Sequence, residues 1–146
     1  MRIRGERSFE APPDLVYRAL TDPTEMAAAF TAIERIEAES DEWTVIVRPP
    51  LPGAFRLRFS VRFEDLRNPE HARLLAWGKS LGGRISVDSS FELRPEGDGT
   101  LMSWQAEVDA AGIFSGLGSQ ALGPVATAQA ERALERIARN LGARAR

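Results

Sequence analysis

The sequence predicts an α+β domain in which a curved, seven-stranded antiparallel sheet surrounds one long C-terminal helix, with two short helices after the first strand. Apolar and polar residues alternate with a period of two from residue 32 to residue 111, interrupted only by short turns. Residues 13–30 have helical spacing instead, and so do the residues after Gly112. The 146 residues contain no linker or repeat, so we expect a single domain over 1–146.

The first strand is expected at residues 2–10. Two prolines at 12–13 end it and favour a helix start, because proline in the first helical turn leaves no N–H unpaired. Helical spacing of apolar residues then covers 15–20 and, after a break, 26–30. These two segments are the two short helices.

Six further strands are expected at 32–39, 42–49, 54–66, 71–80, 83–95 and 100–111. The turns between them are short and rich in glycine, proline, serine and acidic residues, so neighbouring strands should pair antiparallel. In the clearest strand, inward apolar residues alternate with polar ones without interruption: Phe55, Leu57, Phe59, Val61 and Phe63. The inward face of this strand is therefore unusually aromatic.

The same alternation assigns the inward side chains of the later strands. In 71–80 they form a small row that leaves space: Leu74, Ala76 and Gly78. In the last two strands they are larger: Ile85, Val87, Ser89, Phe91, Leu93, Met102, Trp104, Ala106 and Val108. On the opposite face, Leu75 and Trp77 would form an exposed apolar patch with Ile46, which is typical of a partner surface or a homodimer contact.

The last helix is expected to start near Leu117 or Ser119, to bend at Gly123-Pro124 and to end at Gly142. No other element is long enough to cover the apolar face of the sheet. Because a narrow helix need not fill the hollow of a curved sheet, we expect an apolar cavity between the two. The segments expected to border its mouth contain Phe30, Phe114 and Leu117.

Composition excludes several classes of protein. Apolar residues make up 43% of the chain and charged residues 27%, as in ordinary globular proteins, and a net charge of −2 gives no footprint for nucleic acid. There is no cysteine, and hence no disulfide or thiolate metal site. Without a signal-peptide core or an apolar run long enough to span a bilayer, we expect a cytoplasmic protein with no membrane span.

Few inward side chains could catalyse a reaction. The only histidine, His71, falls in a turn and is expected to be solvated rather than catalytic. No set of metal ligands lies on an inward row, so we expect neither a metal nor another cofactor. Arg7 and Ser89 are the polar residues with inward parity. Arg7 would either anchor a carbonyl or carboxylate of a ligand, or extend to the sheet edge and pair with Glu131.

Several motifs resemble a known family over essentially the whole chain. They are Phe9-Glu10-Ala11-Pro12-Pro13, Ala19-Leu20-Thr21-Asp22-Pro23, Pro95-Glu96-Gly97-Asp98-Gly99-Thr100-Leu101, Trp104-Gln105-Ala106-Glu107-Val108 and Leu117-Gly118-Ser119. These motifs and the order of elements resemble the helix-grip fold of the Bet v 1/START (SRPBCC) superfamily, and most closely its carbon monoxide dehydrogenase G-subunit family. The chain departs from that family's pattern at Ala29-Phe30-Thr31-Ala32, where Leu-Pro-Gly is usual, and it stops just after the last helix.

The resemblance implies an accessory protein of a molybdenum-containing dehydrogenase, with roles in carrying quinone in an apolar cavity and in recruiting the enzyme to the membrane. Because the sequence stops just after the last helix, we expect no anchoring extension, which argues against a membrane-anchor role. A transient membrane contact and a homodimer are left open. Together, the residues and the resemblance predict a non-enzymatic carrier for a hydrophobic, lipid- or quinone-like molecule. One alternative is an adaptor with a filled core that acts through the Trp77 face. The other is a cyclase or dehydratase of the same superfamily.

The residues predicted to contact the ligand are mostly the inward apolar side chains described above. The full set is Arg7, Phe30, Phe55, Leu57, Phe59, Leu74, Ala76, Val87, Ser89, Phe91, Trp104, Phe114, Leu117 and Leu122.

Overall fold

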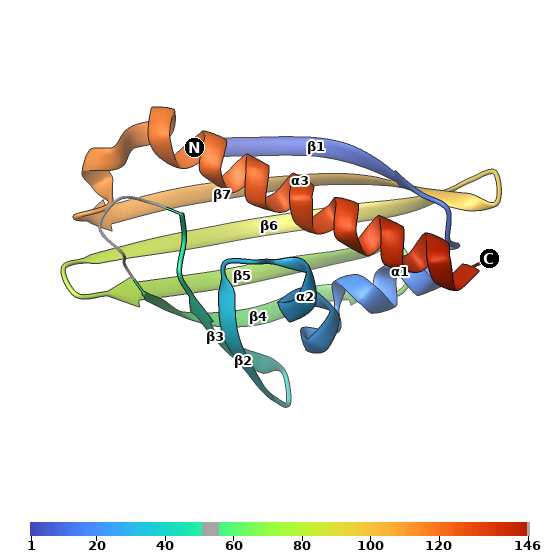
Figure 1. Cartoon of the computed structure of the whole chain (residues 1–146), viewed down its shortest axis with the longest axis horizontal. Helices are drawn as coiled ribbons and strands as arrows, with labels where there is room; N and C mark the ends of the chain where they lie inside the picture. The colour runs from blue at the N-terminus through green and yellow to red at the C-terminus, as the bar shows by residue number, and fades with distance from the viewer. Residues whose placement is uncertain (51–55, 146) are drawn as a thin grey trace.

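The computed structural model describes residues 1–50 and 56–145, except for the side chains of 117–121 and 143–145. The predicted fold is confirmed: one seven-stranded antiparallel sheet curves around a long C-terminal helix (Figure 1). The elements in chain order are β1 (Arg2–Phe9), α1 (Pro13–Leu20), α2 (Pro23–Ala29), β2 (Ile33–Glu39), β3 (Glu42–Val47), β4 (Leu57–Arg67), β5 (His71–Ser80), β6 (Gly83–Glu96), β7 (Gly99–Gly112), the 3₁₀ turn η1 (Ser115–Leu117) and α3 (Gly118–Ala145).

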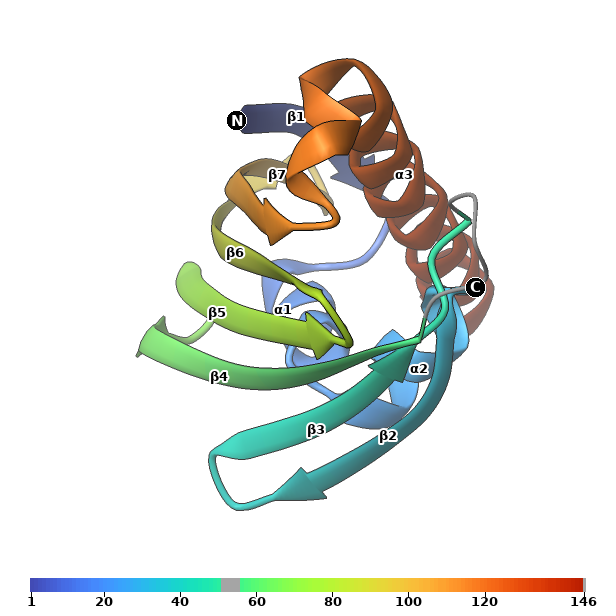
Figure 2. The ribbon, with the colours of Figure 1, turned by 90° about the vertical axis from the view of Figure 1, so that its left-hand side faces the viewer.

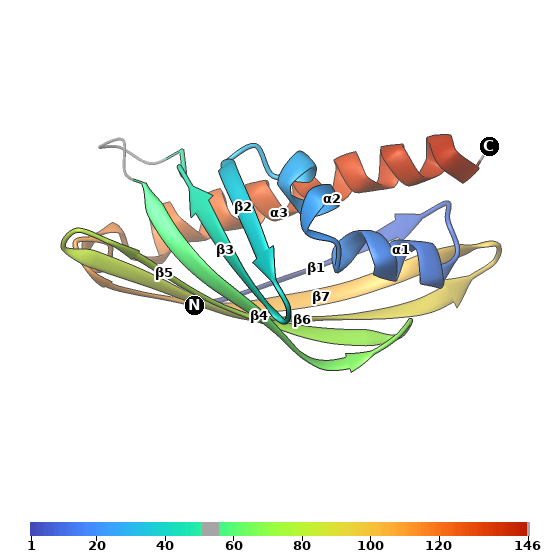
Figure 3. The ribbon, with the colours of Figure 1, turned by 90° about the horizontal axis from the view of Figure 1, so that it is seen from below.

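The order of strands across the sheet is β1-β7-β6-β5-β4-β3-β2, so β1 pairs with β7 from the far end of the chain, whereas the other described pairs join consecutive strands. Seen end-on, the sheet forms an arc from β1 to β2, and α3 crosses the open side of the arc (Figure 2). Seen from below, α3 extends along the sheet, and α1 and α2 lie near its C-terminal half (Figure 3). The sheet and α3 therefore enclose the interior from opposite sides.

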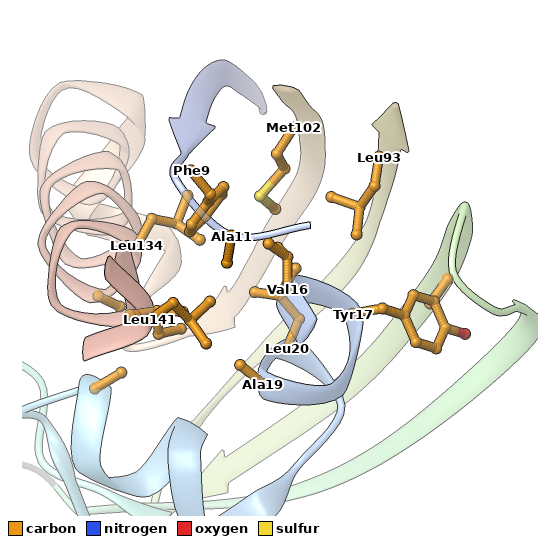
Figure 4. Close-up of a cluster of buried hydrophobic side chains, with 14 residues drawn as sticks. Phe9, Ala11, Val16, Tyr17, Ala19, Leu20, Leu93, Met102, Leu134 and Leu141 are labelled. Atoms are coloured by element: carbon orange, nitrogen blue, oxygen red, sulfur yellow. The ribbon is translucent and has the colours of Figure 1, made fainter. Parts of the chain in front are cut away.

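The two short helices close one end of this interior. Asp22 caps α2, since its Oδ1 accepts hydrogen bonds from the backbone N–H of Thr24 at 2.7 Å and of Glu25 at 3.2 Å. Val16 and Leu20 of α1 are buried in the largest apolar cluster, whose labelled members in Figure 4 also include Phe9, Leu93, Met102, Leu134 and Leu141. This end of the molecule is thus filled by protein side chains.

Two of the motifs that mark the sequence meet at the same end. Thr100, the only polar residue among those fully buried in the described chain, donates its hydroxyl to the carbonyl of Ala11 at 2.8 Å. The neighbouring Gly99 is packed so closely against the Phe9 carbonyl that a side chain there would collide with it. Gly99 and Thr100, the first residues of β7, therefore hold the β6–β7 hairpin against the end of β1 and the segment that leads into α1.

Helix α3 begins at Gly118 as expected, but the predicted end at Gly142 is wrong, because the helix continues to Ala145. Gly142 has no positive φ; instead it is buried, and a Cβ built there would lie 3.2 Å from Oε2 of Glu10. This glycine thus allows close approach of a neighbouring side chain and does not terminate the helix. Pro124 lies within the helix, as predicted.

Candidate functional site

A cavity of about 380 Å³ lies between the concave face of the sheet and α3. Inward residues of the strands form one wall, and the stripe of α3 that runs from Leu122 to Ile137 forms the other. Met26 of α2 and Phe30, the residue that follows this helix, border it as well. This volume is within the range of pockets that bind small molecules.

The structure brings most of the predicted ligand-contacting residues together at this cavity. Those that line it are Phe30, Leu57, Phe59, Leu74, Val87, Ser89, Phe91, Trp104 and Leu122. Phe55 and the side chain of Leu117 lie outside the described residues. The remaining three, Arg7, Ala76 and Phe114, are described but do not line the cavity.

These three residues lie elsewhere in the structure. Phe114 does not border a mouth: it is 1% exposed and packs against the backbone of Gly83, where a Cβ would lie 2.5 Å from its ring. Ala76 is buried in the cluster around Trp43. Arg7 is half-buried on β1, and no ion pair with Glu131 is found in the described part of the chain.

Two large aromatic residues of the cavity wall lie over glycines on the neighbouring strands. The ring of Phe59 covers Gly78, its partner in the β4–β5 register, and a Cβ at Gly78 would lie 2.5 Å from that ring. Trp104 covers Gly5 in the same way: a Cβ at Gly5 would lie 2.9 Å from the indole ring. A ring that occupies the space of a missing side chain extends less far into the interior. These two pairs therefore help to keep the cavity open.

The lining is almost wholly apolar. Of the described residues that line it, none is Asp, Glu, Lys, Arg or His. Ser89 contributes a hydroxyl whose recorded partner, the Leu74 carbonyl, is 3.5 Å away. Gln129 of α3 also lines the cavity and was missed by the sequence prediction. Its position one turn after Val125, on the inward stripe, is the signal that could have identified it.

The outer face of the sheet is charged, and part of this charge is paired. His71 is the first residue of β5, and the prediction of a solvated histidine is wrong, since its side chain is only 17% exposed. Its Nε2 lies 3.2 Å from Oδ2 of Asp65, and its Nδ1 lies 3.9 Å from Oε1 of Glu92. A hydrogen bond from Arg67 lowers the pKa of Asp65. This cluster has outward parity and is separate from the cavity.

Two further properties bear on the candidate functions. Within residues 1–50 and 56–145, no group of His, Cys, Asp and Glu side chains is arranged to hold a metal ion. The helices in the same ranges are too short or too polar to cross a bilayer.

Comparison with known proteins identifies the family. Residues 5–142 match the family of the carbon monoxide dehydrogenase G subunit (CoxG). The chain belongs to the CoxG family. This family is part of the SRPBCC superfamily, which the helix-grip arrangement of sheet and helix also indicates. Family and fold together support a ligand-binding type of domain.

Solved structures share the fold of this CoxG-family chain at low sequence identity. A conserved protein of Geobacillus kaustophilus superposes with a TM-score of 0.89 at 16% identity, over 97% of this chain and 95% of that one. A Thermus thermophilus protein superposes with a TM-score of 0.75 at 20% identity, over the whole of both chains. A Chromobacterium violaceum protein gives 0.72 at 20% identity over 96% of each. A search of curated proteins found no significant match.

Proposed function

We propose that this CoxG-family protein is a non-enzymatic carrier that binds a hydrophobic, quinone- or lipid-like molecule in the cavity between the sheet and α3. The observation that carries the proposal is a cavity of about 380 Å³ whose lining is almost entirely apolar. The assignment as a carrier is supported by the same lining, because its described residues include neither an acid nor a base for catalysis. A cyclase or dehydratase would need one.

The expected affinity follows from the apolar surface that a ligand buries. About 300 Å² at ~25 cal/mol/Å² contributes roughly 7 kcal/mol before the costs of association. After those costs, a dissociation constant near the micromolar range or weaker is expected. Such an affinity suits a protein that collects a ligand and releases it to an acceptor. From the family relationship, we propose a molybdenum-containing dehydrogenase as that acceptor.

The carrier function is tested by fluorescence titration with pyrene and with a soluble quinone. Val87→Phe would fill the cavity from the middle of β6, and Phe59→Arg would place a charge in it. Both variants should lose saturable binding, whereas Trp77→Ala on the outer face should keep it. Thermal unfolding shows whether each variant is folded. No saturable binding by the native protein, or unchanged binding in both folded cavity variants, would contradict the proposal.

A second candidate, an adaptor for an acidic partner protein, is favoured by one feature of the outer face. Arg58, Lys79 and Arg84 lie directly opposite one another on three neighbouring strands, and no ion pair involves them among the described residues. Like charges in this position repel one another, and an acidic surface would relieve the repulsion. Trp77, two residues before Lys79 on the same face, is 43% exposed, with the Arg62 guanidinium 5.4 Å above its ring.

The adaptor role predicts salt-sensitive binding to the dehydrogenase that depends on this face. Lys79→Glu should abolish co-purification of the dehydrogenase and leave pyrene binding intact. Glu37→Lys, at an exposed position of the edge strand β2, is the control for an unrelated change of charge. Retention of the enzyme by Lys79→Glu would rule out this surface.

A further inference from the structure

Among the residues that the structure describes, the cavity lining has no group that could balance a charge on its ligand. Its described lining contains no ionisable side chain, either on the wall formed by the sheet or on the wall formed by α3. An ionised carboxylate that entered this space would lose its hydration without gaining a counter-charge, which strongly disfavours binding. An uncharged ligand of the same length does not incur this penalty.

The hydrogen-bonding side chains of the lining are few, and they are neutral. Ser89 on β6 has only the long contact of 3.5 Å with the Leu74 carbonyl. The Trp104 indole and the Gln129 amide line the cavity without a recorded hydrogen bond among the described residues. Ser90 and Gln105 also border it, but their register positions turn their side chains to the outer face.

Gln129 is unusual for its place on the helix. It is half-buried and shares the inward stripe with Leu122 and Val125, whereas the charged residues Glu131 and Arg132 are exposed. A glutamine amide offers both a donor and an acceptor, so it can bond to a carbonyl or to a hydroxyl group of a ligand. Without such a partner, the amide of Gln129 is a polar group facing a nearly apolar cavity.

We propose that the cavity selects uncharged ligands that carry a carbonyl or hydroxyl group, and that Gln129 provides the hydrogen bond to that group. This inference rests on the proposed carrier function and names the class of ligand. It excludes fatty acids in their ionised form, and it admits long-chain alcohols, esters and ring ketones.

The selectivity is tested by displacing bound pyrene at pH 8 with three ligands of equal chain length: hexadecanol, methyl hexadecanoate and hexadecanoate. The alcohol and the ester should displace pyrene at concentrations at least tenfold lower than the carboxylate. Equal displacement by all three would overturn the selectivity while leaving the carrier function intact. If pyrene itself shows no saturable binding, the carrier function fails first.

The role of Gln129 is tested by two substitutions at one position. Gln129→Leu should lower the affinity for hexadecanol about five- to tenfold and leave the affinity for pyrene unchanged, because only the hydrogen bond is lost. Gln129→Arg should raise the affinity for hexadecanoate at least tenfold, because the arginine supplies the missing counter-charge. Arg132→Leu, on the exposed side of α3, is the matched control. It should change neither the affinity for hexadecanol nor that for hexadecanoate. Unchanged hexadecanol binding in Gln129→Leu, or no gain for hexadecanoate in a folded Gln129→Arg, would overturn the assignment of Gln129.

Discussion

The ring of Phe59 on β4 lies against the backbone of Gly78 on β5, so closely that a Cβ at Gly78 would be 2.5 Å from the ring. The two residues are opposite one another in the strand register. The aromatic side chain covers a position that would otherwise expose backbone to the interior. One wall of the cavity therefore depends on the absence of a side chain at position 78.

Gly78→Ala should destabilise the protein by about 1–3 kcal/mol, because the added methyl group forces the Phe59 ring out of its place. The displaced ring would move into the cavity and weaken pyrene binding. Urea unfolding and fluorescence titration measure the two effects. Gly116→Ala, with no atom within 4 Å of the new methyl group, is the control and should be near neutral. Full pyrene affinity in Gly78→Ala would show that the ring does not bound the cavity.

Thr100→Val should cost about 1–3 kcal/mol, although the two side chains have nearly the same shape, because the valine leaves the buried Ala11 carbonyl without its hydrogen bond. In the native protein that bond measures 2.8 Å. Denaturant unfolding measures the loss. Thr44→Val on the outer face of β3 makes the same chemical change where no such bond is recorded, and it should have little effect. A neutral Thr100→Val would mean that the start of β7 is held against the segment before α1 by packing alone.

The strands and their facing residues could be predicted because β-sheets have a simple period. One face of β4 is apolar at every second residue, and this pattern fixes which side chains point toward α3. The inward position of Val87 and Trp104 follows from the same rule. The cavity wall on the sheet side was therefore accessible from sequence, and most of the described residues predicted there line it.

Other features depend on contacts between distant residues, which local patterns do not contain. His71 is enclosed because a bulge between Glu64 and Arg67 brings Asp65 toward it, and because Glu92 on β6 lies opposite. Asp65 adopts a positive φ of 49° at this bulge. Gly142 has the sequence position of a helix stop, but its role is set by the distant Glu10. Such features require the tertiary structure.

Phe114→Ala should destabilise the protein by about 3–5 kcal/mol, as expected for a buried phenylalanine whose removal leaves a cavity. The ring is 1% exposed and belongs to the cluster around Leu57 and Ile85. Chemical denaturation gives the size of the effect. Leu81→Ala is the control and should change stability by less than about 0.5 kcal/mol, because this turn residue is 97% exposed. A small loss for Phe114→Ala would place its ring at the surface, as the sequence prediction had it.

Acid should lower the stability of the folded protein, because several carboxylates on the outer face of the sheet have lowered pKa values in the folded state. Arg73 donates to both oxygens of Asp88, at 2.9 and 2.6 Å, and this lowers the pKa of Asp88 from its usual 3.8. Arg67 does the same for Asp65, and the N-terminal ammonium, followed by Arg2, lowers the pKa of Glu107. The unfolded chain thus binds these protons more readily than the folded one.

The contribution of these carboxylates to stability is therefore complete above their unfolded pKa values. It is lost as the pH falls below about 4 and through the lower folded values. Because all three are substantially exposed, solvent screening keeps each contribution small. Urea unfolding from neutral to strongly acidic pH should show this loss, and Asp88→Asn should flatten the slope at acid pH. Asp41→Asn, at a turn outside the recorded ion pairs, serves as the control. An identical pH slope for Asp88→Asn and the native protein would show that the Arg73 pair adds nothing to stability.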